Sequence, residues 1–260
     1  MQERHNNRKL YFHELAETCT NYFIPYINRW HEVKAGMRVM EIGCGEGGNL
    51  LPFARLGCNV TGVDIASCRI EEARRFFTAE QARGKFIAQD IFKLQEPGQQ
   101  YDIIICHDVL EHIGNKSLLL RRIAGFLSQG GIIFMSFPAW QMPFGGHQQI
   151  CRNRILSHLP FIHLLPEVMY RGLIRLAGED EACLGELLSI RRTRITVEAF
   201  ERLAKREGLT VWDRTLYLVN PHYKVKFGLK PRQLRRPVSG IPYLRDFLCS
   251  SCFYILSRRE

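Results

Sequence analysis

The stretch VMEIGCGEGG, at residues 39–48, joins an apolar segment to a run of glycines and decides the fold class. Residues 38–42 predict a short strand, and residues 49–56 show the pattern of a helix that stops at Gly57. A glycine-dense turn between a strand and a helix lets the backbone approach a ligand closely, because glycine adopts positive φ without steric cost. The stretch therefore predicts a strand–loop–helix unit that binds a ligand with its backbone.

Strand and helix patterns alternate on both sides of this stretch. The expected strands are 38–42, 60–63, 85–88, 103–106 and 132–136, and the expected helices between them are 49–56, 67–82 and 116–127. The segment 103–106 is an unbroken apolar run, which is typical of a strand covered on both faces. This alternation predicts βαβ units and a parallel sheet.

The rest of the chain is less regular. Residues 10–31 predict an amphipathic helix broken around Pro25, and residues 139–195 predict a mostly helical insertion. A helix at 197–207 and strands at 210–219 and 252–256 follow the insertion. A basic stretch connects these last two strands, and long connections in compact domains are usually functional or disordered.

Composition narrows the class of protein. The 260 residues fit one large domain, or a domain with a substantial insertion. The 46% hydrophobic and 24% charged residues exclude wholesale disorder and low complexity. No apolar run reaches the length of a bilayer span, and no signal core follows the basic start, so we expect a cytoplasmic protein. Nine cysteines without a framework predict free thiols.

The positive charge is concentrated in the second half of the chain. Residues 1–140 carry a net charge of +1 and residues 141–260 a net charge of +9, and the run 214–245 holds eight Lys or Arg and no acid. This distribution suggests an anionic partner, which is a charged substrate, a membrane surface or nucleic acid. The alternative is a solvated basic face that only aids solubility.

The glycines fit two ligand-binding patterns. Gly43, Gly45 and Gly48 satisfy G-x-G-x-x-G, the dinucleotide pattern, whereas Gly43, Gly45 and Gly47 satisfy G-x-G-x-G with Glu41 two residues before it. Acids beside the loop would repel a pyrophosphate and tolerate a cation. This argument disfavours a nicotinamide dinucleotide.

The segment EIGCGEG resembles the first motif, E-x-G-x-G-x-G, of the class I S-adenosylmethionine-dependent methyltransferases. Asp64 and Asp90 match the family's acids after the second and third strands, and CHDVLEHI, at 106–113, matches its motif after the fourth. The resemblance implies S-adenosyl-L-methionine as cofactor and S-adenosyl-L-homocysteine as product. It implies that Asp64 binds the ribose, that Asp90 and Ile91 hold the adenine, and that His107 and Asp108 border the methionine end. The cofactor-binding set implied is Glu41, Gly43, Cys44, Gly45, Gly47, Asp64, Ile65, Asp90, Ile91, His107 and Asp108.

The family also implies a fold, an α/β architecture with a doubly wound, Rossmann-like sheet of seven strands. The strand order is 3-2-1-4-5-7-6 with the last strand antiparallel, and a mostly helical insertion follows strand 5. We expect one domain, 1–260, in which residues 1–34 form a helical lid, 139–195 bind the substrate and 220–245 form the basic connection.

Two histidines are candidates for a general base, because imidazole titrates near neutral pH. His112 lies just beyond the fourth strand beside Glu111, and His147 lies just past the fifth strand between glycines and polar residues. Alternatively, His112 only packs at the start of a helix, and His147 is a loop residue without function. No Cys, His and Asp set has metal-ligand spacing, so no metal site is predicted.

The expected reaction is methyl transfer to a small, partly apolar acceptor, with oxygen favoured as the methylated atom. The basic second half supports an RNA methyltransferase as a second hypothesis. Residues 159–177 are apolar with two arginines, and together with the basic connection they support peripheral contact with an anionic membrane, for a quinone or lipid acceptor. A binding protein that has lost catalysis is a further alternative. The sequence specifies neither the acceptor nor the oligomeric state.

Overall fold

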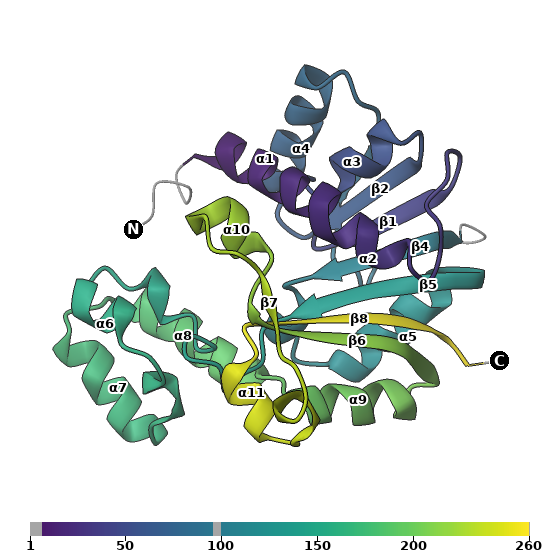
Figure 1. Ribbon diagram of the computed structural model, residues 1–260. Coiled ribbons are helices and arrows are strands. Elements are labelled where there is room, and N and C mark those ends of the chain that lie inside the picture. The colour runs from purple at the N-terminus through teal and green to yellow at the C-terminus, as the bar shows by residue number, and fades with distance from the viewer. Residues whose placement is uncertain (1–6, 96–99, 260) are drawn as a thin grey trace.

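The computed structural model describes residues 7–95 and 100–259 (Figure 1). These residues form one eight-stranded sheet in the order β3-β2-β1-β4-β5-β8-β6-β7. Its strands are β1 (Arg38–Ile42), β2 (Asn59–Asp64), β3 (Lys85–Ala88), β4 (Tyr101–His107), β5 (Leu127–Phe137), β6 (Leu209–Val219), β7 (Arg232–Gln233) and β8 (Ser251–Arg258). Neighbours among β1 to β5 pair in parallel, and β8 pairs antiparallel with β5 and β6.

The predicted sheet is confirmed, with one addition. If β6 and β8 are counted as strands 6 and 7, the order is the expected 3-2-1-4-5-7-6, and the last strand is antiparallel. The addition is β7, a two-residue strand within the basic connection that pairs antiparallel with β6 at the sheet edge. So short a strand leaves no period-2 pattern in the sequence.

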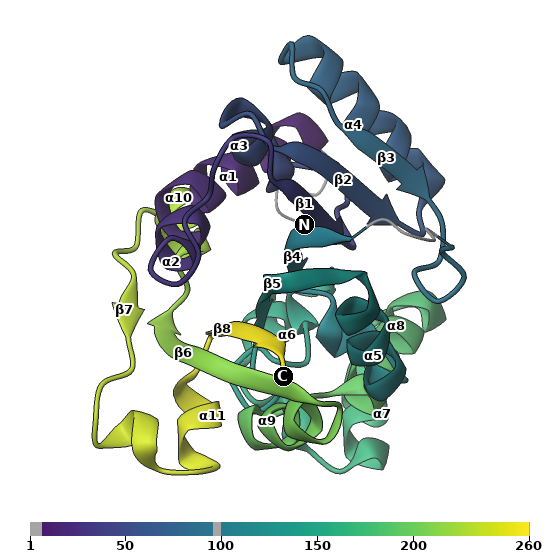
Figure 2. The same cartoon turned by 90° about the vertical axis from the view of Figure 1, so that its right-hand side faces the viewer.

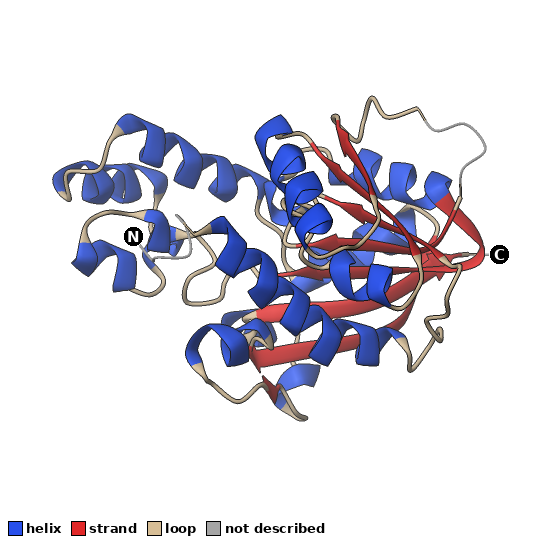
Figure 3. Cartoon of the chain, turned by 90° about the horizontal axis from the view of Figure 1, so that it is seen from above, coloured by secondary structure: helices blue, strands red, loops and turns tan. Residues whose placement is uncertain are grey.

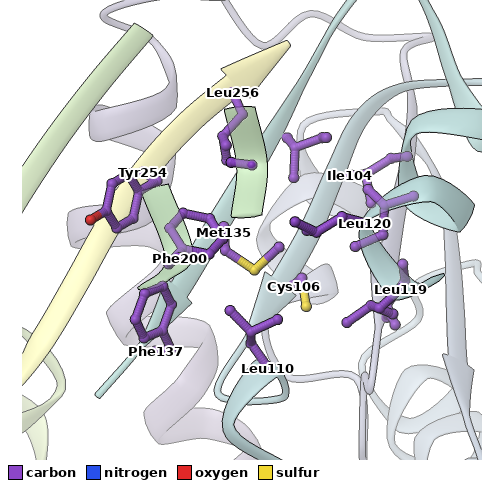
Figure 4. Packing of buried hydrophobic residues seen from close by; sticks show 14 of the residues in the cluster. Ile104, Cys106, Leu110, Leu119, Leu120, Met135, Phe137, Phe200, Tyr254 and Leu256 are labelled. Atoms are coloured by element: carbon purple, nitrogen blue, oxygen red, sulfur yellow. The ribbon is translucent and has the colours of Figure 1, made fainter. Parts of the chain in front are cut away.

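Alternate residues of the strands face two separate cores. On one face, Ile104 and Met135 pack with Leu120 of α5 (Lys116–Phe126) and Phe200 of α9 (Val197–Arg206), as Figure 4 shows. On the other, Val39 and the strand residues in register with it pack with α3 (Leu50–Arg55), α4 (Ser67–Ala79) and the N-terminal helices. This two-sided burial explains why β4 reads as a continuous apolar run.

The N-terminal helix covers the glycine loop. It consists of α1 (Arg8–Thr18), a π-helical segment η2 (Cys19–Phe23) and α2 (Ile24–Ile27). The chain thus stays helical through Pro25, which lies in the first turn of α2, so the expected break is wrong. The helix changes to π-helical hydrogen bonding just before this residue. Residues 1–6 of the expected lid lie outside the described residues.

The insertion after β5 is helical, as predicted, and has a small core of its own. It contains α6 (Arg154–His158), α7 (Glu167–Leu176), α8 (Glu181–Thr193) and the short 3-10 segments η4 (Gln148–Ile150) and η5 (Ile162–Leu164). Tyr170 and Ile174 of α7 are buried in this core beside Leu187 of α8. Figures 1 and 3 show the insertion beyond the end of the sheet.

The basic connection between β6 and β8 folds into short helices and one short strand. It forms α10 (His222–Phe227), β7, the 3-10 segment η6 (Val238–Gly240) and α11 (Leu244–Leu248), and Figure 2 shows its course along one side of the molecule. The helix α10 packs against α1, where the Thr18 hydroxyl and the His222 Nδ1 lie 2.9 Å apart. Among the described residues, we find no helix with the length and apolar character needed to cross a membrane.

Candidate active site

The three glycines of G-x-G-x-G all adopt positive φ, with values of 69° for Gly43, 51° for Gly45 and 83° for Gly47. A side chain at Gly43 has no room either, since an added Cβ would lie 2.3 Å from the Val109 Cγ2. The Gly43 amide donates to the Val63 carbonyl at 2.8 Å, which ties the loop to the end of β2. The glycines are therefore required by the shape of this loop.

Asp64 holds the loop from the end of β2. One carboxylate oxygen accepts from the Gly45 amide at 2.9 Å, and the other accepts from the Ala66 amide at 2.9 Å. The next side chain, Ile65, is 75% exposed. The structure thus places a carboxylate and an uncovered apolar side chain together at the open end of the parallel strands, where ligands of α/β sheets bind.

Glu41 lies beneath the loop, with only 1% of its surface exposed. Asn49 donates to its Oε1 at 2.7 Å, while its Oε2 has no hydrogen-bond partner among the described residues. Burial raises the pKa of Glu41 to about 8, against the lowering effect of the Asn49 hydrogen bond, and the nearby Asp64 charge raises it further. Glu41 is thus near Asp64 but is not on the exposed rim.

Asp90 follows β3, which is the neighbour of β2. Its carboxylate accepts from the Phe92 amide at 3.0 Å, and the preceding residue, Gln89, donates to the Asp64 carbonyl at 2.9 Å. The predicted adenine neighbour Ile91 is buried in the core with Val63. The two strand-end acids, Asp64 and Asp90, are thus brought to one edge of the sheet.

The Cys44 side chain turns away from the loop opening. It is buried, and an added Cβ at Gly62 would lie 2.7 Å from its sulfur, so the side chain points into the sheet. A contact of Cys44 with a ligand would therefore have to come from its backbone.

His107 and Asp108 end β4 beside the loop. The His107 Nδ1 lies 2.6 Å from the Ser136 hydroxyl, and its Nε2 lies 3.5 Å from the Asp108 carboxylate. Asp108 has a φ of +52° and donates its amide to the Ser136 carbonyl at 3.0 Å. Ser136, which sequence reasoning missed, therefore orients both residues from β5.

The two candidate bases meet, although 35 positions separate them in the sequence. The rings of His112 and His147 lie edge to face with their centroids 5.3 Å apart. Burial lowers the pKa of His147 to about 4, aided by the neighbouring His112 and His163, and burial also lowers the pKa of His112. Burial thus favours the neutral form of both imidazoles, which is the form that can accept a proton.

The fold also assembles ligand sets that the spacing of the sequence does not reveal. Donor atoms of Glu111, His112 and His147 lie within 4.8 Å of one another, and both carboxylate oxygens of the buried Glu111 lack hydrogen-bond partners among the described residues. A second set of this kind is Cys151, Glu179 and Cys183, inside the insertion. One carboxylate and two imidazoles are ligands that suit Zn²⁺.

A cavity of about 760 Å³ lies between the sheet edge, α1, the insertion and α10. Tyr11, Asp108 and His147 line it, so it brings together a residue from each of three segments distant in sequence. The other lining residues are Pro138, Met142, Phe144, Gln149, Ile150, Cys151, Arg152, Arg154, Ser157, His158, Asn220, His222, Tyr223, Lys226, Phe227, Leu229 and Ser250. Most of these residues belong to the insertion or to the basic connection, and no local sequence motif indicates that these segments meet.

This geometry agrees with the comparisons to known proteins. The sequence profile of a family described as "Methyltransferase domain" matches residues 33–164, just over half of the chain. The chain belongs to this methyltransferase domain family. The predicted family is thereby confirmed, and the match includes the glycine loop and the ends of β2, β3 and β4.

The methyltransferase domain is 34% identical over 186 residues to a ubiquinone biosynthesis O-methyltransferase of Chelativorans sp. (strain BNC1), a match that covers 72% of this chain and 64% of that relative. The match thus spans less than two thirds of the relative's length.

Two solved structures share the fold. A S-adenosylmethionine-dependent methyltransferase from Clostridium acetobutylicum ATCC 824 matches with a TM-score of 0.58 at 11% identity, covering 94% of this chain and 92% of that one. Magnesium protoporphyrin IX methyltransferase from Synechocystis PCC 6803, with bound S-adenosylhomocysteine, matches with a TM-score of 0.55 at 16% identity, covering 95% and 84%.

Proposed function

We propose that this methyltransferase domain transfers a methyl group from S-adenosyl-L-methionine to an oxygen of a small, partly apolar acceptor. The observation that carries the proposal is the cavity shared by Asp108, at the predicted cofactor edge, and His147, at the start of the insertion. Methyl transfer needs the nucleophile in line behind the sulfonium, so an enzyme mainly has to position the two reactants. A cavity that joins the cofactor edge to a base meets this need.

The residues at the sheet edge fit the cofactor by their chemistry. Asp64 and Asp90 offer acceptors for ribose hydroxyls and for the adenine amino group, and the exposed Ile65 offers an apolar surface for the ring. The cofactor, when bound, supplies the methyl group on a cationic sulfur. Asp108 places negative charge near that end, which favours a cation over a pyrophosphate.

His147 favours oxygen as the methylated atom. A hydroxyl must lose its proton as it attacks carbon, and a neutral imidazole that lines the cavity can take that proton. His112 contacts His147 edge to face, so the pair offers a second imidazole behind the first. An amine acceptor would need no such base. The name of the Chelativorans relative, an O-methyltransferase, supports the same atom.

The test uses S-adenosylmethionine with a labelled methyl group and two matched acceptors, catechol and ortho-phenylenediamine, which differ in oxygen and nitrogen. We expect label in the methyl ether of catechol and little in the diamine, and loss of label in Asp64→Ala. Label in the diamine alone would refute oxygen as the methylated atom. Failure of the wild-type protein to bind S-adenosylhomocysteine by calorimetry would refute the cofactor.

The exposed face of α7 favours a second candidate, a peripheral membrane enzyme that methylates a quinone-type acceptor. Val168 and Leu176 are 83% and 89% exposed and lie eight residues apart, on one side of the helix. An amphipathic helix with uncovered apolar residues is suited to the interface of a bilayer. The name of the Chelativorans relative includes ubiquinone biosynthesis, which supports an acceptor of this kind.

Sedimentation with phosphatidylglycerol vesicles tests this second candidate. We expect binding that falls in Val168→Asp/Leu176→Asp and in the triple neutralisation of Arg232, Arg235 and Arg236, but not in the control Glu181→Gln on α8. Equal sedimentation of all variants with the wild type would refute membrane contact through these segments.

A further inference from the structure

The lining of the acceptor cavity is electrically polarised. Its one carboxylate among the described residues is Asp108, which directly follows β4, while Arg152, Arg154 and Lys226 line it from segments outside the sheet. Two of these cations belong to the insertion and the third to α10, which Figure 1 shows above α6. The acid is thus at the sheet side of the cavity, and the cations are on its outer walls.

Arg154 is the cation in this set that the fold itself does not neutralise. Arg152 forms an ion pair with Asp180 at 3.0 Å, so its charge is partly neutralised within the insertion. By contrast, no carboxylate lies within ion-pairing distance of the Arg154 guanidinium in the described parts of the chain. A guanidinium at a cavity wall without a carboxylate offers a planar fork of donors that matches a carboxylate or phosphate group.

Lys226 approaches the same cavity from α10. It is half-buried, its ammonium lies 5.3 Å from the centre of the Phe227 ring, and both residues line the cavity. Partial burial strengthens the interaction of an ammonium with an anion, because less water screens the charge. Met142, Phe144 and Ile150 add apolar side chains to the lining of the same cavity.

We propose that the acceptor is amphipathic and carries an anionic group, a carboxylate or a phosphate, which Arg154 and Lys226 bind at the outer wall of the cavity. The nucleophilic oxygen then lies at the opposite end, near His147 and the cofactor edge, and the apolar part lies between them. The inference rests on the proposed methyl transfer, because it takes this cavity as the acceptor site. It adds the substrate class and two specificity-determining residues.

Binding of simple decyl amphiphiles tests the proposal without any methyl transfer. Decanoate, decyl phosphate and decanol share one chain and differ in the head group, and each displaces the neutral fluorophore N-phenyl-1-naphthylamine from protein saturated with S-adenosylhomocysteine. We expect at least one of the two anions to bind about tenfold more tightly than decanol, the size of one charge-assisted contact. The better of the two identifies the head group.

Matched variants locate the preference. Arg154→Gln/Lys226→Gln is expected to reduce the anion-to-alcohol affinity ratio to about one, with decanol affinity unchanged. Lys224→Gln, on the same helix but not in the cavity lining, is expected to keep the wild-type ratio. Binding of S-adenosylhomocysteine by every variant controls for folding.

Two results would overturn the proposal. One is equal affinity of the wild type for decanol and both anions, and the other is an unchanged ratio in the double variant. Failure of the methyl-transfer assay with the anion preference intact would instead refute the proposed function alone, so the two failures are distinguishable.

Discussion

Replacing Gly43 with alanine tests the geometry on which the candidate site depends. The added Cβ would lie 2.3 Å from the Val109 Cγ2, and the residue would keep a φ of +69°. A left-handed conformation costs an L-residue roughly 1–2 kcal/mol. Overpacking against a side chain adds about 1–3 kcal/mol. We therefore expect Gly43→Ala to lower the free energy of unfolding by about 2–5 kcal/mol.

Gly36→Ala is a matched control for the conformational part alone. Gly36 has a φ of +86°, and an added Cβ there would have nothing within 4 Å among the described residues. Its expected cost is therefore only the roughly 1–2 kcal/mol of the left-handed conformation. For a protein of this size each kcal/mol lowers Tm by about 2–4 °C, so calorimetric Tm values separate the two variants.

A double-mutant cycle isolates the contact with Val109. Val109→Ala removes the methyl groups that an alanine at residue 43 would meet, so the pair of substitutions should cost about 1–3 kcal/mol less than the sum of the single ones. The cycle is measured by urea unfolding at constant pH. Costs that are equal for Gly43→Ala and Gly36→Ala, together with additive behaviour in the cycle, would refute the close approach of Val109 to the loop.

Three further predictions concern the acids and the base. Asp64→Ala should weaken S-adenosylhomocysteine binding in calorimetry at least tenfold. The substitution removes the acceptor predicted for the ribose and leaves the Gly45 and Ala66 amides without their carboxylate partner. Unchanged affinity would contradict the assignment. Burial raises the pKa of Glu41 to about 8, so the folded protein holds a proton that the unfolded chain releases near 4.5, and stability falls as pH rises between these values. Glu41→Gln should remove that decline in urea unfolding at pH 5 and pH 8.5, and a parallel decline in both proteins would count against it. His147→Gln should lower kcat for an oxygen acceptor by roughly 10²-fold or more. Because burial lowers the pKa of His147 to about 4, the acid limb of the wild-type pH profile of kcat/KM should lie well below pH 6.5. A wild-type acid limb at pH 6.5 would exclude His147 as the base.

Local rules explain why much of the sheet was predictable. The glycines of the loop have positive φ in the structure, and that requirement is what makes glycine informative in a sequence. β1 and β3 begin and end at the expected residues because each is bounded by turn residues. The predicted break near Pro25 was wrong, because a π-helical segment keeps the chain helical there. Such a segment has no sequence signature of its own.

Features that depend on tertiary contact were not predictable. Nothing in the sequence around Glu41 shows that Asn49 will be its hydrogen-bond donor or that the carboxylate will be buried. The pairing of His112 with His147 likewise requires the insertion to fold back onto the end of β4. The stacking of α10 on α1 is a contact of this kind, and it closes the cavity from a segment that the sequence marked only as basic.

The distribution of charge gives the cavity a direction. The four acids predicted to bind the cofactor lie within or just after strands of the sheet, whereas Arg154 and Lys226 line the cavity from segments outside it. If acids and cations were mixed along one wall, the cationic cofactor and the anionic acceptor would both be attracted to the same part of the cavity. Separation of the two charges lets Coulomb attraction orient the acceptor, with its anionic end away from the acids and its hydroxyl toward the methyl donor. If the proposed acceptor is right, Arg154 and Lys226 account for two of the positive charges in the second half of the chain without a nucleic-acid partner.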